Sequence, residues 1–182
     1  MNTEDSLPMV KVRRLSGRLA RLCRLALPVT LAAPFLWWLC LDPPLVLEGL
    51  PNGIPYPGHL TPAIRVGAAA VSLVPAAVLA RLLALLARLF SGFAAGRVFC
   101  RESQDLLRRI GRTLALWFGA GVLTQTAMVL VLTLGNPPGS RILRLGFSGS
   151  DCAALFLMAV TWLLTSIFAE AARIADDNQG IV

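Results

Sequence analysis

The chain has 182 residues, of which 56% are hydrophobic and only 15% are charged. Soluble domains are ~45 to 50% apolar and ~25% charged, so this composition excludes a disordered chain and argues against a soluble globule. The net charge of +7 would suit a nucleic-acid binder, but such a protein needs basic surface in water rather than long uncharged runs. Long uncharged runs dominate this chain, so we expect no direct binding of nucleic acid.

A basic segment comes first in the chain, over residues 1–24. Its positive charges and its leucines recur at helical spacing on two different faces: Lys11, Arg14, Arg18 and Arg21 on one, and Leu15, Leu19 and Leu22 on the other. A basic amphipathic helix of this kind can lie in a membrane interface. We therefore predict that residues 1–24 form a cytoplasmic N-terminal segment beside anionic lipid headgroups.

Four apolar runs follow, each close to the length that crosses a ~30 Å hydrocarbon core. They are residues 25–41, 66–87, 113–134 and 152–169, and the only charge inside them is Arg81. Helices satisfy all their backbone polar groups internally where no water is available. The predicted fold is therefore an all-α integral membrane protein, with a bundle of four transmembrane helices in a membrane domain over residues 25–182.

The charges outside these runs predict the orientation. Thirteen lysines and arginines lie before the first run, between the second and third, and after the fourth, whereas the other side has only Arg65, Arg141 and Arg144. Lysine and arginine are enriched in cytoplasmic segments, so both termini are expected in the cytoplasm. The cytoplasmic arginines are expected to attract anionic lipid headgroups.

Two residue pairs could join separate helices. Arg81 lies near the cytoplasmic end of the second run, and Glu170 closes the fourth run at the same side, so an ion pair between them is expected. Cys40 and Cys152 both fall at the outer face, where a disulfide between them could form. The chain has no C-x-x-C, no H-E-x-x-H, no G-x-S-x-G and no phosphate-cradling glycine loop. We therefore expect no enzymatic activity, no metal and no cofactor.

The connection between the second and third runs carries more pattern. Gly92 and Gly96 form a small-xxx-small pair that would allow close helix approach. Glu102 and Asp105 open what we predict to be a short helix, in which Asp105 can pair with Arg109 four residues later.

Two stretches then resemble one family. The inner connection has Arg97-Val98-Phe99, then Glu102, then Leu106-Leu107-Arg108-Arg109-Ile110-Gly111, and the chain ends in Asp176-Asp177-Asn178 before a short apolar terminus. These stretches resemble the inner-loop and C-terminal signatures of a bacterial family of four-helix membrane proteins of uncharacterised function, domain of unknown function 2975. The resemblance implies a bacterial inner-membrane location and a helix-turn-helix regulator as a cytosolic partner.

These motifs all fall on the predicted cytoplasmic side. They define a candidate docking surface of Arg97, Phe99, Glu102, Arg108, Arg109, Gly111, Asp176, Asp177 and Asn178. We therefore expect a non-enzymatic membrane protein that docks a cytosolic regulator or relays a signal to it. The alternative is a small transporter or channel subunit that works as an oligomer of identical chains.

Overall fold

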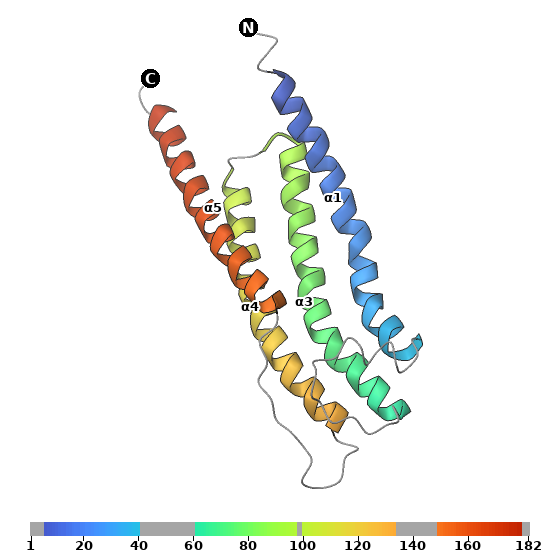
Figure 1. Cartoon of the computed structure of the whole chain (residues 1–182). Helices are drawn as coiled ribbons and strands as arrows, with labels where there is room; N and C mark the ends of the chain where they lie inside the picture. Colours follow the sequence, from blue (N-terminus) through green and yellow to red (C-terminus); the bar gives the residue numbers. More distant parts are fainter. Residues whose placement is uncertain (1–5, 41–60, 98–99, 134–148, 180–182) are drawn as a thin grey trace.

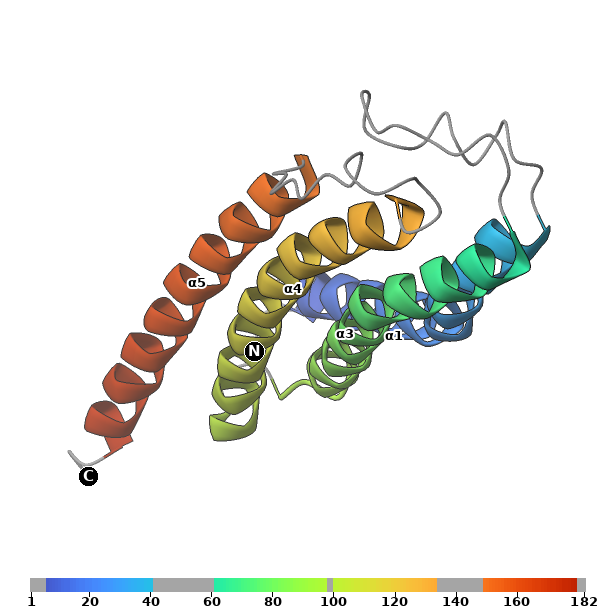
Figure 2. The ribbon, with the colours of Figure 1, turned by 90° about the horizontal axis from the view of Figure 1, so that it is seen from below.

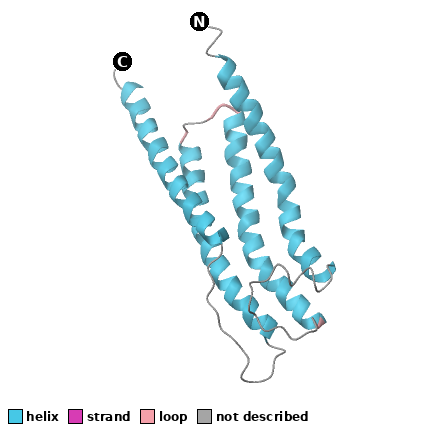
Figure 3. Cartoon of the chain, viewed as in Figure 1, coloured by secondary structure: helices cyan, strands magenta, loops and turns pink. Residues whose placement is uncertain are grey.

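A computed structural model describes residues 6–40, 61–97, 100–133 and 149–179 of the chain. Within these residues the chain is helical and has no strand (Figure 3). The elements are α1 (Ser6–Phe35), the π-helical turn η1 (Leu36–Cys40), α3 (Pro62–Ala94), α4 (Arg101–Thr133) and α5 (Gly149–Gln179). The all-α prediction is confirmed for this part of the chain.

The helices pack in chain order. The extensive contacts between long helices are those of α1 with α3, α3 with α4, and α4 with α5. Figure 2 shows the same order, with α5 lying beyond α4 on the side away from α1. The four predicted helices are therefore present as an open row whose ends are α1 and α5.

Three of these helices are long and apolar enough to cross a membrane, over Val10–Leu39, Pro62–Ala94 and Arg101–Thr133. In α5 the apolar stretch within the described residues, Cys152–Ile167, is shorter. The chain is thus a helical protein with three membrane-compatible spans, and a fourth span remains a prediction. At 1.5 Å per residue, the 33-residue helices α3 and α4 are ~50 Å long, so they project beyond a ~30 Å hydrocarbon core.

The basic segments are continuations of the spanning helices. Residues 6–35 form one α-helix, so no break separates the basic segment from the first apolar run. The short helix predicted at Glu102 is likewise the first part of α4. The beginnings of α1 and α4 and the ends of α3 and α5 lie at one end of the molecule (Figure 1), which we call the arginine end.

Helix α3 begins four residues before the second predicted run, which starts at residue 66. Thr61 is the N-cap, its side chain accepts a hydrogen bond from the backbone N–H of Ile64 (3.4 Å), and α3 begins at Pro62. Proline in the first turn has no intrahelical hydrogen bond to lose, and its fixed φ suits the helix. Pro62 therefore begins a helix rather than preventing one.

Small residues bring α1 and α3 together. Ser16 and Ala20 are buried on α1, and a Cβ built on Gly17 would lie 3.9 Å from the Cβ of Ala94 on α3. Leu15 and Leu22, in contrast, are 60% and 61% exposed. The leucine face predicted from the sequence is therefore directed away from the protein, and the small-residue face makes the helix contact.

At the end of the helices opposite the arginine end, η1 packs against α3. The indole N–H of Trp38 donates a 3.0 Å hydrogen bond to the hydroxyl of Ser72, and Trp38 is buried with Ala68 and Leu132. The π-helical turn begins two residues after Pro34, where the proline ring removes a backbone donor from the helix.

Large apolar side chains cover the outside of the row. Trp162 and Phe156 on α5 are 75% and 69% exposed, and Leu123 on α4 is 72% exposed. Soluble monomers rarely expose contiguous apolar surface of this kind, whereas a helix that contacts lipid must present it. The outer surface therefore supports the assignment as a membrane protein.

Candidate functional site

A cavity of about 620 Å³ lies at the arginine end. Its walls come from α1, the last turns of α3, the α3–α4 connection and the first turns of α4. We call it the arginine cavity, and it is lined by Arg24, Arg88, Leu89, Ser91, Gly92, Arg97, Cys100, Glu102, Ser103, Asp105, Leu106 and Arg109.

One wall depends on how α3 ends. Gly96 has φ +82°, a left-handed conformation that only glycine adopts without strain, and its N–H donates to the carbonyl of Phe93 (3.0 Å). The N–H of Arg97 donates to the carbonyl of Gly92 (3.0 Å), which closes the turn. From α1, the guanidinium of Arg13 donates to the carbonyl of Ala95 (3.3 Å). The basic segment therefore holds the connection in place.

The Gly92 and Gly96 pair does not act as predicted. Gly96 lies outside α3 and stops the helix, and the nearest atom to a Cβ built on Gly92 is the backbone oxygen of Arg97, at 3.8 Å. These two glycines therefore shape the turn, whereas Gly17 and Gly67 lie at contacts between helices.

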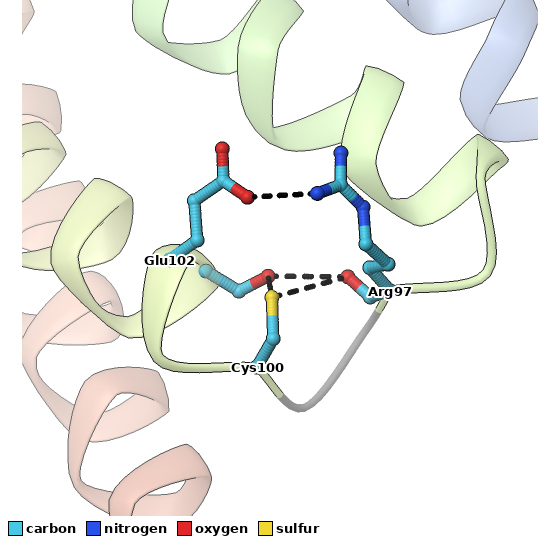
Figure 4. A network of polar contacts seen from close by, with 4 residues as sticks. Arg97, Cys100 and Glu102 are labelled. Atoms are coloured by element: carbon cyan, nitrogen blue, oxygen red, sulfur yellow. Dashed lines mark hydrogen bonds and ion pairs between the residues drawn. The ribbon is translucent and has the colours of Figure 1, made fainter.

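A second wall is a polar network at the start of α4 (Figure 4). The carbonyl of Cys100 accepts hydrogen bonds from the N–H of Ser103 (3.0 Å) and that of Gln104 (3.3 Å). The hydroxyl of Ser103, which is only 3% exposed, donates to the carbonyl of Arg97 (3.2 Å) and also lies 3.2 Å from the sulfur of Cys100. The guanidinium of Arg97 forms an ion pair with Glu102 (3.1 Å). Arg97 is therefore bound, through its carbonyl and its side chain, to the first turn of α4.

The network changes the acidity of a thiol. The hydrogen bond from the Ser103 side chain is the largest cause that lowers the pKa of Cys100 below its ordinary value. Partial burial and the charge of Glu102 act in the opposite direction, and the net shift is downward.

The cavity holds more positive than negative charge. Arg24 donates a 2.9 Å hydrogen bond to the neutral hydroxyl of Ser91, which in turn donates to the carbonyl of Ala87 (2.7 Å). Among the residues that line the cavity, Arg97 and Glu102 form the one ion pair. The pair expected between Asp105 and Arg109 is not formed there. Exposed pairs four residues apart on a helix stabilise it by only ~0.3 to 0.5 kcal/mol, so this absence costs little.

The predicted docking residues divide into groups. Arg97, Glu102 and Arg109 line the arginine cavity, and Arg108 is exposed beside it on α4. Gly111 instead faces α5, where a Cβ built on it would lie 3.8 Å from Thr161. Phe99 lies outside the described residues, as do the side chains of Asp176, Asp177 and Asn178 in the last part of α5.

Neither predicted helix-joining pair is tested by the fold. Arg81 on α3 and Glu170 on α5 are both exposed, and α4 is the shared packing neighbour of their helices. Cys152 is an exposed thiol near the start of α5, and the side chain of Cys40 lies outside the described residues. Both pairs remain predictions.

The docking surface predicted from the sequence lacks six polar residues of the cavity. They are Arg24, Arg88, Ser91, Cys100, Ser103 and Asp105. A signal for two of them was present, because Arg24 immediately precedes the first apolar run and Arg88 immediately follows the second. Antiparallel neighbouring helices place such boundary residues at the same depth in the membrane.

The comparisons with known proteins agree with the resemblance in the inner connection. The sequence profile of one family, described as "Protein of unknown function (DUF2975)", matches residues 23–182. No curated protein and no solved structure matches the chain.

Proposed function

Because the chain belongs to the uncharacterised DUF2975 family, we propose its function from its own structure: it is a non-enzymatic membrane protein that docks a cytosolic regulatory protein at the arginine end. We place it in a bacterial inner membrane with both termini in the cytoplasm. The observation that carries the proposal is that three residues of the predicted docking surface, Arg97, Glu102 and Arg109, line one cavity.

The geometry suits a protein partner. Arg97 and Glu102 are 61% and 64% exposed although they pair with each other, so both can exchange this pairing for groups on a partner. Surface ion pairs contribute only ~0 to 1 kcal/mol, so the exchange costs little. The ~50 Å helices also carry these side chains beyond the hydrocarbon core, where a soluble protein can reach them.

A transport role has less support. Thr126, Thr133 and Thr161 each donate a hydrogen bond to a carbonyl four residues earlier in their own helix. Hydroxyls in lipid-facing or packed helices commonly bond in this way, so these three do not by themselves indicate a polar path for a substrate. A small oligomeric transporter nevertheless remains the alternative, with flux of a substrate into proteoliposomes as its test.

Site-specific photocrosslinking in native membranes tests the docking role. A photoreactive residue at Asp105, in the cavity, is expected to crosslink to a soluble protein, whereas the same residue at Leu123, exposed in the span of α4, is expected to crosslink only to lipid or membrane protein. Arg109→Glu is expected to abolish the Asp105 crosslink. If position 105 yields no soluble protein, or yields one that Arg109→Glu leaves unchanged, the docking proposal is wrong.

A further inference from the structure

We propose that the arginine cavity binds a phosphate group, and that this phosphate belongs to the headgroup of an anionic phospholipid. The proposal does not rest on the docking role, because a small ligand can occupy the cavity whether or not a protein partner binds at its mouth.

The cavity has the dimensions of a ligand site. Its volume of about 620 Å³ lies within the ~300 to 1,000 Å³ typical of small-molecule pockets. Three helices form most of its walls together with Arg97 and Cys100, and the hydrogen bonds of Arg13 to Ala95 and of Ser103 to Arg97 hold the end of α3 against α1 and α4. The site is therefore largely formed before a ligand arrives.

The charges of the cavity select an anion. Arg24, Arg88 and Arg109 form no ion pair with another described residue, and Asp105 is the one cavity carboxylate that is likewise without such a pair. The planar guanidinium group matches two phosphate oxygens at once, which an ammonium group cannot do. The N-terminus of α4 lies in the same wall and adds the positive end of a long helix dipole.

The depth of the cavity favours a lipid as the source of the phosphate. Arg24 adjoins the apolar run that begins at Leu25, and Arg88 adjoins the one that ends at Ala87, so both lie where the hydrocarbon core gives way to headgroups. Leu89 and Leu106 line the same cavity and offer apolar contact to the glycerol part of a lipid. Basic pockets between membrane helices on the cytoplasmic side bind anionic headgroups.

Lipid binding to the purified full chain in detergent tests this proposal. Native mass spectrometry would count bound phosphatidylglycerol, with phosphatidylcholine as the zwitterionic comparison. The expected result is binding of phosphatidylglycerol in preference to phosphatidylcholine. Inorganic phosphate and glycerol 3-phosphate are added as competitors, because they carry the phosphate group without the acyl chains.

Matched variants separate the cavity from general electrostatics. Arg88→Gln with Arg109→Gln removes two cavity arginines, and Arg101→Gln with Arg112→Gln removes two exposed arginines of α4 that do not line the cavity. The cavity variant is expected to lose affinity at least about tenfold, since hydrogen bonds to charged groups are the stronger kind, while the control keeps wild-type affinity. Arg109→Lys keeps the positive charge but loses the planar guanidinium that can bind two phosphate oxygens at once. Its affinity is expected to lie between that of the cavity variant and that of the control variant.

The outcomes are distinct. The site would be overturned if the two double variants lost the same affinity for phosphatidylglycerol. It would also be overturned if the protein showed no preference for phosphatidylglycerol over phosphatidylcholine and bound neither of the soluble phosphates. Soluble phosphates that bind in the cavity while phosphatidylglycerol does not would support the phosphate chemistry and overturn the lipid source. Because the readout contains no protein partner, failure of the docking proposal would leave it unchanged.

Discussion

At the start of α4, one hydroxyl group influences the ionisation of a thiol. Ser103 has a single hydroxyl proton, and both the carbonyl of Arg97 and the sulfur of Cys100 lie 3.2 Å from its oxygen. When Cys100 ionises, its sulfur can only accept, so the Ser103 proton turns toward it and leaves the Arg97 carbonyl. Ionisation of the thiol is therefore coupled to the bond that ties the connection to α4.

The first prediction concerns the reactivity of Cys100. The other three cysteines are replaced by serine, so that only Cys100 reacts, and its alkylation rate is measured against pH. The midpoint pH of this curve should be lower for the folded protein than for the unfolded chain, because folding lowers the pKa of Cys100. Ser103→Ala should move the midpoint to higher pH, since it removes the hydrogen bond that contributes most to the lowered pKa. Glu102→Gln should move it downward, since the carboxylate raises the pKa. Midpoints that shift in the same direction in both variants would contradict this account.

A second prediction concerns Gly96. Alanine at this position would have to adopt φ +82°, and its Cβ would lie 3.0 Å from the guanidinium of Arg13. We expect Gly96→Ala to lower the free energy of unfolding by ~1 to 3 kcal/mol, measured by thermal denaturation in detergent. Gly92→Ala is the control, because Gly92 is helical and a Cβ there would lie 3.8 Å from its nearest neighbour. Equal effects of the two variants would show that Gly96 is not specially constrained.

At the scale of the helices, small side chains decide how α1 packs on α3, whereas α3 and α4 meet at a buried cluster of large apolar residues: Leu82, Leu85, Leu89, Leu107, Ile110 and Leu114. The α1 and α3 helices meet at Ser16, Gly17 and Ala20, and the start of α3 contributes Ala68 and Ala69 to the opposite end of the core. Between helices in lipid, close backbone approach supplies the attraction that the hydrophobic effect supplies in water. Leu15 and Leu22 of α1 then remain on the outer surface.

The third prediction follows from this division. Ala20→Leu is expected to destabilise the protein by ~1 to 3 kcal/mol, because Ala20 is 4% exposed and the added atoms must separate α1 from α3. Leu22→Ala, two residues along the same helix but on its exposed face, is expected to change stability by less than ~0.5 kcal/mol. Thermal denaturation of the two variants in the same detergent provides the measurement. A larger loss from Leu22→Ala would reverse the assignment of the faces.

The positions of the helices could be predicted from the sequence more fully than the contacts between them. Long apolar runs identify helices because few other structures are stable in lipid: α3 contains the run at 66–87, and α4 contains residues 113–133 of the run at 113–134. The boundaries were missed where Pro62 begins a helix and where the basic segment continues into the first span. Arg97, Glu102 and Arg109 were placed in the site, but Ser91 and Ser103 were not, because their hydrogen bonds join segments whose proximity no local pattern encodes.

At the scale of the whole molecule, charge and apolar surface are segregated along the helix axes. Exposed apolar side chains such as Leu123 and Trp162 lie well inside α4 and α5, whereas four arginines line the cavity at the arginine end. A bilayer is a medium in which such a surface is stable, and the asymmetry of the arginines predicts that the arginine end faces the cytoplasm.

The fourth prediction tests that orientation. In a background in which the native cysteines are serine, Ala95→Cys places a thiol at the arginine end and Ala63→Cys places one at the other end, and both alanines are exposed. A membrane-impermeant thiol reagent applied to intact cells should label position 63 and leave position 95 unlabelled until the membrane is opened. Labelling of position 95 in intact cells would reverse the predicted topology.

The open row also has a consequence for biogenesis. Because α3 packs on α1, α4 on α3 and α5 on α4, every helix meets its main neighbour as soon as it leaves the ribosome and enters the membrane. Contacts between segments that are close in sequence form quickly, and an N-terminal unit can fold before synthesis of the chain is complete. The walls of the arginine cavity belong to α1, α3 and α4 and to the connection between the last two, so this site can be assembled before the last helix has been translated.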